Sequence, residues 1–451
     1  MGAFFILIII LNYRLKDFRL SLVISYIAST IIYTGKMYFF EIIPPGVFPK
    51  IMYPEGNVLF FTITPQNILS VLLALFMIRD IFLNGLKKLH LEVVDIFVFL
   101  YFLWPIISDI TSSLRPDVSI LFSLQSLLIF TAYVYVKSYV PDKIKKFIPI
   151  LLAIIASQII FESVISAQQF VFSSPTVKNM EALVNLDPEF FSNASDDTGF
   201  SYRPAGTFPH TNYMAMRMSF WLIAILPFLF KKRRSLYIYP FVIGITTLVL
   251  TLSRSAWIGF SLATLFCLFI IEKVRKIKPP LILSKNFMSL GVIAVILIFV
   301  FVMPRLESSL YTFTTGGGGL REKQVEDTVG LITQNPVFGV GTGMNVLAGL
   351  KTYSQGVFSK EALTVHNWYL LTAVESGIPS LLFFTAFLIY KIRKTLIFLM
   401  HGILEDVKFL TLGLMGGIVA LLAVGMFQPT IDSGIILLSF AILGDKQNEK
   451  Y

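Results

Sequence analysis

Long, continuously apolar runs alternate along this chain with shorter polar connections. Many of the runs approach about 20 residues, the length that a helix needs to cross a hydrocarbon core of about 30 Å. A barrel strand would instead alternate apolar and polar positions. The pattern therefore predicts about twelve membrane-spanning helices, near residues 20–34, 67–83, 93–108, 117–136, 147–172, 211–230, 236–252, 255–272, 287–304, 367–390, 409–427 and 433–445.

Composition indicates the same class. Of the 451 residues, 55% are hydrophobic and 14% are charged, with a mean hydropathy of +0.76. Soluble domains average about 45–50% apolar and about 25% charged residues. We predict an all-α integral membrane protein in which residues 1–451 form one polytopic domain. The apolar segment 2–11 lacks a preceding basic region and a cleavage site, so we expect a short or interfacial helix and not a cleaved signal.

Basic residues gather in alternate connections, which predicts that these connections face the cytoplasm. With about twelve spans, both termini are then expected in the cytoplasm. The pI of about 9.4 follows from this topology, so we predict no nucleic-acid partner. The predicted cytoplasmic clusters include Arg14, Lys16 and Arg19; Lys87 and Lys88; Lys137, Lys143, Lys145 and Lys146; Lys231 to Arg234; and Lys391, Arg393 and Lys394.

Two of the predicted outer connections are long, at residues 173–210 and 305–366. Long connections of this kind are usually functional or disordered. The second is the longest polar segment of the chain and contains four consecutive glycines at 316–319. No internal repeat is visible, which speaks against a transporter built from inverted repeats.

Two histidines, His210 and His366, lie at the predicted outer ends of spans, each close to an asparagine. A neutral imidazole can take a proton from a hydroxyl. The neighbouring Asn212 and Asn367 could cap the helices or orient the imidazoles. Glu375 falls in the helix after His366, where a carboxylate needs a partner, so it is a structural contact or a supporting site residue.

Arginines on the same predicted face are candidate anion binders. Arg254 lies in a short turn at the start of a predicted helix, where unpaired N–H groups and the helix dipole favour an anion. Arg321 follows the glycine run, and its guanidinium suits bidentate phosphate binding. The alternative for each is a side chain that snorkels or balances an acidic loop. Further arginines near this face are Arg203, Arg217 and Arg305.

Metal and nucleotide sites are not indicated. The glycine-rich segment 339–343 lacks the Lys-Ser/Thr of a phosphate-binding loop and faces away from cytoplasmic nucleotides. Asp196 and Asp197 form an adjacent pair without further ligands. Cys267 is the one cysteine, which excludes an intrachain disulfide and a cysteine metal site. We therefore expect no metal and no cofactor.

Taken in order, several short segments resemble the O-antigen ligase and polymerase superfamily. No single segment is specific, but their order and spacing agree with the family over roughly residues 200–380. The N-terminal half resembles it only as a string of spans. The segments are GTFPHTN at 206–212, SRSAW at 253–257, Leu320-Arg321, NPVFGVGTG at 335–343, HNWYL at 366–370 and ESG at 375–377.

The resemblance implies a helical glycosyltransferase of the GT-C type in the bacterial cytoplasmic membrane. It would be inverting and metal-independent, with its active site on the extracytoplasmic face. Family roles carry over to Arg254 and Arg321 as pyrophosphate binders and to His366 as the base. Family members often have a tryptophan shortly after the second arginine, whereas residues 322–325 are EKQV here. Arg305 therefore stays an alternative to Arg321.

The implied partners are an undecaprenyl-pyrophosphate-linked glycan as donor, a glycan, lipid or protein as acceptor, and the surrounding membrane lipids. Ligase and repeat-unit polymerase share this chemistry and differ only in the acceptor. We favour the ligase. A polysaccharide or lipid transporter is the alternative from another class, but it would place ionisable residues near mid-membrane.

Overall fold

The computed structural model describes residues 2–32, 37–41, 60–85, 89–172, 203–208, 210–230, 235–275, 319–353, 364–401 and 405–443. This part of the chain is mainly helical, and eight of its helices are long and apolar enough to cross a membrane. They match eight predicted spans and confirm a multi-pass helical membrane protein. The eight are Pro65–Asn84, Asp95–Ser112, Pro116–Tyr139, Pro141–Phe172, Thr211–Phe230, Arg254–Ile271, Trp368–Met400 and Glu405–Gly425.

Four further apolar helices are shorter. They are α1 (Gly2–Leu15), α2 (Phe18–Ile31), α9 (Ser235–Leu250) and α18 (Ser433–Leu443). The last three correspond to predicted spans, and α1 covers the segment 2–11. The predicted span at 287–304 lies outside the described residues, so the total of twelve stays a prediction. A short antiparallel pair, β1 (Met37–Glu41) and β2 (Phe60–Ile63), is an addition to the expected all-α class.

The chain forms two compact units, and each is described here by itself. Unit 1 comprises Met1–Leu151, Leu320–Phe398 and Pro429–Tyr451. Unit 2 comprises Leu152–Gly319 and Leu399–Gln428. Two helices, α6 (Ile144–Phe172) and α16 (Trp368–His401), contribute to both units.

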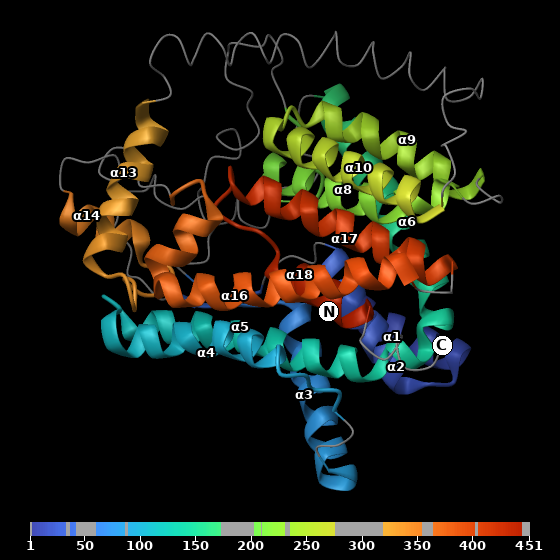
Figure 1. Cartoon of the computed structure of the whole chain (residues 1–451), viewed down its shortest axis with the longest axis horizontal. Coiled ribbons are helices and arrows are strands. Elements are labelled where there is room, and N and C mark those ends of the chain that lie inside the picture. Colours follow the sequence, from blue (N-terminus) through green and yellow to red (C-terminus); the bar gives the residue numbers. More distant parts are fainter. Residues whose placement is uncertain are drawn as a thin grey trace. The chain divides into compact units, whose positions relative to one another are not determined.

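In unit 1, α4 (Asp95–Ser112) and α5 (Pro116–Tyr139) are joined by a turn of three residues, and α16 packs beside them (Figure 1). Pro116 starts α5 at a position where the missing N–H is not needed. Aromatic contacts hold the three helices together, with ring centroids 4.7 Å apart for Tyr101 and Phe384 and 6.0 Å apart for Tyr133 and Phe387. α3 (Pro65–Asn84) also packs on α5.

One end of these three helices carries a cluster of charges. Glu92 accepts hydrogen bonds from Lys137 at 3.2 Å, from Lys391 at 2.8 Å and from Lys394 at 2.5 Å. Asp95 accepts from Lys137 at 2.7 Å. Lys137 and Lys391 are buried on α5 and α16 and pair with Glu92, whereas the sequence placed them in the connections between spans.

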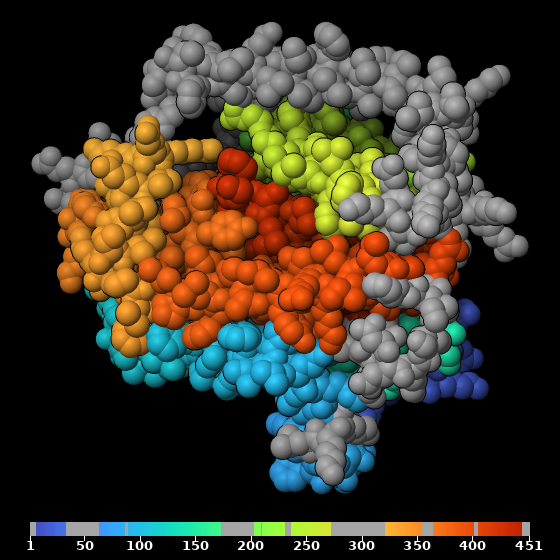
Figure 2. All heavy atoms as spheres, in the orientation of Figure 1, coloured from blue at the N-terminus to red at the C-terminus, as the bar shows by residue number. Residues whose placement is uncertain are grey.

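The predicted outer connection 305–366 contains two helices among its described residues. They are α13 (Gly319–Gln334) and α14 (Asn345–Thr352). Figure 2 shows their amber surface next to the orange surface of α16 in unit 1. The segment between them, residues 335–344, carries the glycine-rich motif and packs against α4, α5 and α16.

Unit 2 is built from α8 (Thr211–Ile225), the short 3-10 helix η5 (Leu226–Phe230), α9, α10 (Arg254–Arg275), α17 (Glu405–Gly425) and the second part of α6. Small residues let these helices approach closely, as in other membrane bundles. A Cβ at Gly413 would collide with the Ala224 carbonyl, and one at Gly416 would collide with the Cys267 thiol. Cys267 is accordingly buried in this packing.

Candidate functional site

His366 lies directly before α16, in a tight backbone turn. The Asn367 N–H donates to the Val365 carbonyl at 2.8 Å, and the Asn367 side-chain oxygen accepts from the Leu370 N–H at 3.1 Å. Asn367 therefore caps the first turn of α16, one of the two roles expected for it. Val365 is fully buried, so the backbone on one side of His366 is anchored in the core.

The surroundings of His366 favour the neutral imidazole. Burial lowers its pKa from 6.5 to about 4, and the positive charge of Arg321 acts in the same direction. A hydrogen bond with the Thr364 backbone opposes the shift. A histidine with this pKa carries no proton on its acceptor nitrogen near pH 7 and can serve as a base.

Arg321 lies in the first turn of α13 with an exposed side chain. It is close enough to His366 for its charge to lower the histidine pKa. The same helix is tied to the backbone next to His366, because Gln324 Nε2 donates to the Thr364 carbonyl at 3.1 Å. Arg321 and His366 were selected from the sequence for separate reasons, and the structure brings them into the same region.

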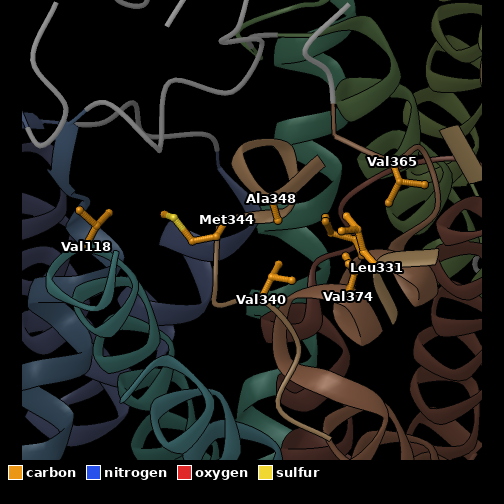
Figure 3. Packing of buried hydrophobic residues seen from close by; sticks show 8 residues of the cluster. Val118, Leu331, Val340, Met344, Ala348, Val365 and Val374 are labelled. Atoms are coloured by element: carbon orange, nitrogen blue, oxygen red, sulfur yellow. The ribbon is translucent and has the colours of Figure 1, made fainter. Parts of the chain in front are cut away.

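An apolar cluster in unit 1 joins the segments that carry these residues. Figure 3 shows side chains from α5, α13, the glycine-rich segment, α14 and α16 in one buried group. Burial of each Val, Leu or Met side chain in it contributes about 1.5–3 kcal/mol. The group therefore packs Val365, which precedes His366, and α13, the helix that begins near Arg321, into one core, and its members are Val118, Leu331, Val340, Met344, Ala348, Val365, Leu371 and Val374.

Helix α16 is broken nine residues after its start. Gly377 has φ 78° and ψ 165°, which no helical residue adopts. The glycine-rich segment supplies hydrogen bonds at the break. The N–H of Val340 donates to the Val374 carbonyl at 2.8 Å, that of Gly341 to the Glu375 carbonyl at 2.9 Å, and that of Ile378 to the Pro336 carbonyl at 2.9 Å.

Glycine is required at this contact because the two backbones touch. Gly339 and Gly341 have φ of 64° and 99°, as only glycine adopts readily. A Cβ at Gly339 would lie 2.6 Å from the Glu375 carbonyl, and one at Gly377 would overlap the Val337 carbonyl. The motif at 335–343 is therefore a cradle for the broken helix. The sequence analysis excluded a nucleotide loop here but did not find this role.

In unit 2, Arg254 is the first residue of α10, as the sequence predicts. The preceding turn is held by the Trp257 indole, which donates to the Leu248 carbonyl at 3.0 Å. Gln428 donates to the Ser255 hydroxyl at 3.4 Å. The N–H groups of the first turn of a helix have no partner within the helix, so this position suits an anion.

Arg203 links one motif of unit 2 to the backbone that leads into the other, a role that the sequence alone did not predict. Its Nε donates to the Thr251 carbonyl at 3.0 Å, and its Nη2 donates to the Asn212 side-chain oxygen at 3.1 Å. Thr251 lies three residues before Arg254. The guanidinium therefore links the motif GTFPHTN to the backbone two residues before the turn SRSAW.

His210 caps α8. Its Nδ1 accepts the N–H of Asn212 at 3.0 Å, so a neutral His210 carries its proton on Nε2. In this pair the histidine caps the helix and the Asn212 side chain accepts from Arg203. In the other pair it is the asparagine, Asn367, that caps the helix. His210 is thus placed to support the local fold and to donate a hydrogen bond, and not to act as a base through Nδ1.

The expected site residues fall into two groups. His366, Arg321, Asn367 and Glu375 belong to unit 1. Arg254, His210 and Asn212 belong to unit 2. Glu375 supplies its backbone carbonyl to the glycine-rich cradle. Three residues considered from the sequence lie outside the described part of the chain: Arg305, Asp196 and Asp197.

Comparison with known proteins supports the resemblance seen in the sequence. Residues 239–385 match the family model described as O-antigen ligase, which confirms the resemblance to the O-antigen ligase and polymerase superfamily. The match runs from α9 into α16 and contains Arg254, Arg321, the cradle and His366. No curated protein matches the chain significantly.

Proposed function

We propose that this chain, with an O-antigen ligase match over residues 239–385, is a membrane glycosyltransferase that moves a glycan from undecaprenyl pyrophosphate to an acceptor hydroxyl. The observation that carries the proposal is the electrostatic effect of Arg321 on His366. The histidine pKa of about 4 favours a neutral base, and the Arg321 guanidinium, which lowers that pKa, is exposed and can bind phosphate.

In the proposed reaction, neutral His366 accepts the proton of the acceptor hydroxyl. The hydroxyl oxygen forms a bond to the anomeric carbon while the bond from that carbon to the pyrophosphate oxygen breaks. The anomeric centre passes through an oxocarbenium-like state, and negative charge grows on the departing lipid pyrophosphate. Attack opposite the leaving group inverts the anomeric configuration.

We assign Arg321 and Arg254 to that growing charge. Fixed cationic donors stabilise a transition state because they need no reorganisation when the charge develops. Arg254 has the added field of the α10 N-terminus. In this proposal no nucleotide takes part, since the pyrophosphate ester already supplies the driving force, and the arginines stabilise the leaving pyrophosphate in place of a metal. The GT-C type of fold is part of the same proposal.

For the sidedness, we propose an active site on the extracytoplasmic face of the cytoplasmic membrane, with both termini in the cytoplasm. The distribution of basic residues supports it. In unit 1 the charged cluster of Glu92 and Lys391 lies at the start of α4 and beside the second half of α16. The cradle and His366 belong to the opposite ends of the same helices, as this topology requires.

The family match allows a ligase or a polymerase, and the two activities differ in the acceptor that receives the glycan. We favour a ligase that transfers to a terminal acceptor, and a polymerase of lipid-linked repeat units is the alternative. The test uses purified protein with undecaprenyl-pyrophosphate oligosaccharide alone, and products resolved by length. Transfer only after a terminal acceptor is added supports the ligase, whereas a ladder of longer lipid-linked glycans without it establishes the polymerase. Absence of transfer to every acceptor contradicts the proposal.

A further inference from the structure

A buried carboxylate lies on α4 outside the residues discussed so far. The side chain of Asp109 is fully buried, and α4 is one of the eight candidate spans. An acidic side chain in such a place is costly unless its oxygens are hydrogen-bonded, and it commonly marks a functional site. The partners of Asp109 therefore show what it does.

Each carboxylate oxygen accepts one hydrogen bond, either from the glycine-rich cradle or from α5, which packs against the cradle. Oδ1 accepts the backbone N–H of Thr342 at 2.7 Å, and Oδ2 accepts the Ser123 hydroxyl at 2.5 Å. Ser119 donates to the Thr342 carbonyl at 2.9 Å. The two backbone polar groups of Thr342 are thus satisfied by side chains of α4 and α5, and not by secondary structure.

From Thr342 the contacts continue to the half-helix behind His366. The preceding residue, Gly341, donates its N–H to the Glu375 carbonyl, and Val340 donates to the Val374 carbonyl. These carbonyls belong to the short first part of α16, residues 368–376, which ends at the Gly377 break. Its start is the turn that presents His366. A short segment with a break at one end needs an external support to keep its position.

We infer that Asp109 is a positioning residue for the transfer reaction, which holds the Thr342 backbone and, through the cradle, the half-helix that presents His366. This inference rests on the function proposed above. Among the residues that the structure describes, Asp109 accepts from hydroxyl and amide donors and not from cations. Its contribution is hydrogen-bond acceptance, so a neutral acceptor of the same shape should replace it.

The test compares two isosteric variants. Asp109→Asn keeps an oxygen for the Thr342 N–H, and its amide can donate to Ser123 Oγ. Asp109→Leu removes the acceptors at similar volume. We expect Asp109→Leu to lower kcat on the order of a hundredfold with little change in KM, as for a displaced catalytic group. Asp109→Asn should retain most of the turnover.

A second measurement does not depend on catalysis. Hydrogen–deuterium exchange in nanodiscs reports on the amides of 335–345 and 366–376. In Asp109→Leu, exchange there should rise by about tenfold, since the Thr342 N–H loses the carboxylate that accepts its hydrogen bond. Exchange in α8 and α10 should stay at the wild-type level, which distinguishes local loosening from general unfolding.

The outcomes separate the two proposals. Local acceleration and a kcat loss in Asp109→Leu, both restored in Asp109→Asn, establish the positioning role. Normal turnover in Asp109→Leu overturns it, and so does equal loss in both variants with unchanged exchange. If the wild type transfers no glycan, the proposed function fails. The exchange data then still decide whether Asp109 holds the cradle.

Discussion

The N–H of Gly341 donates to the carbonyl oxygen of Glu375 at 2.9 Å. This bond joins the segment NPVFGVGTG to the segment ESG, and the two bonded residues are 34 positions apart in the sequence. The family resemblance alone gives no sign that the two segments touch. The bond explains why a glycine-rich segment without any phosphate-loop features accompanies a histidine at a helix start. The glycines allow one backbone to approach another, and the broken helix then presents His366.

The contact at the α16 break predicts a severe effect of a single methyl group. Gly377→Ala should lose transfer and destabilise the protein by about 2 kcal/mol or more, because Gly377 has a positive φ and the new Cβ would overlap the Val337 carbonyl. Thermal unfolding in detergent and the transfer assay measure this. The control is Gly85→Ala, which has φ 74° but nothing within 4 Å of the new Cβ. Equal effects of both changes would contradict the close-contact account.

The pKa of His366 predicts the acid limb of the rate profile. Since burial and Arg321 lower this pKa to about 4, the fraction of neutral base stays high from pH 7 down to about 5. kcat/KM should therefore fall only as the pH approaches about 4. Arg321→Gln removes a positive charge, so the pKa of His366 should rise and the acid limb should move to higher pH. If the acid limb does not move in this variant, the charge of Arg321 does not influence the pKa of the base.

The two hydrogen bonds of Arg203 predict that lysine cannot replace arginine at this position. Its guanidinium reaches both the Thr251 carbonyl and the Asn212 side chain, which a lysine ammonium cannot do in the same fork geometry. Arg203→Lys should raise the KM for the lipid-linked donor by about tenfold, because two hydrogen bonds near Arg254 are lost or weakened. Arg115→Lys is the matched control, since Arg115 is exposed and pairs only locally with Asp117. Equal KM values in both variants would exclude this role of Arg203.

Removal of divalent metal provides a separate prediction. If arginines alone stabilise the departing pyrophosphate, EDTA should leave the rate of transfer unchanged. Titration of purified enzyme with chelator, followed by addition of Mg²⁺ or Mn²⁺, measures this. A rate that falls with EDTA and returns with either cation would require a metal in the reaction.

The helical class and eight of the spans could be predicted from the sequence because apolar runs of sufficient length have few other uses. Arg254 at a helix N-terminus and Asn367 as a cap were also accessible, since capping depends on neighbouring residues. The pairing of Lys137 and Lys391 with Glu92 could not be found this way, because it joins helices distant in sequence. The basic-residue pattern therefore assigned these lysines to the cytoplasmic connections.

The cradle was missed for a related reason. Glycine spacing in 339–343 is visible in the sequence, but its partner is the backbone of Val374 and Glu375, which leaves no side-chain signal. The Gly-Ile-Pro sequence at 377–379 was the available sign of a broken helix. Asp109 and the linking role of Arg203 were missed because each side chain bonds a backbone group distant in the sequence, the Thr342 N–H and the Thr251 carbonyl.

The most direct test of the account is the turnover of His366→Ala with the lipid-linked donor and its acceptor. Removal of the base should lower kcat by about a hundredfold or more, while binding of the donor, measured separately, should stay near the wild-type level. His366→Ala should also show the wild-type exchange pattern at 335–345, since the cradle does not need the imidazole. Near-normal turnover in this variant would contradict the assignment of His366 as the base.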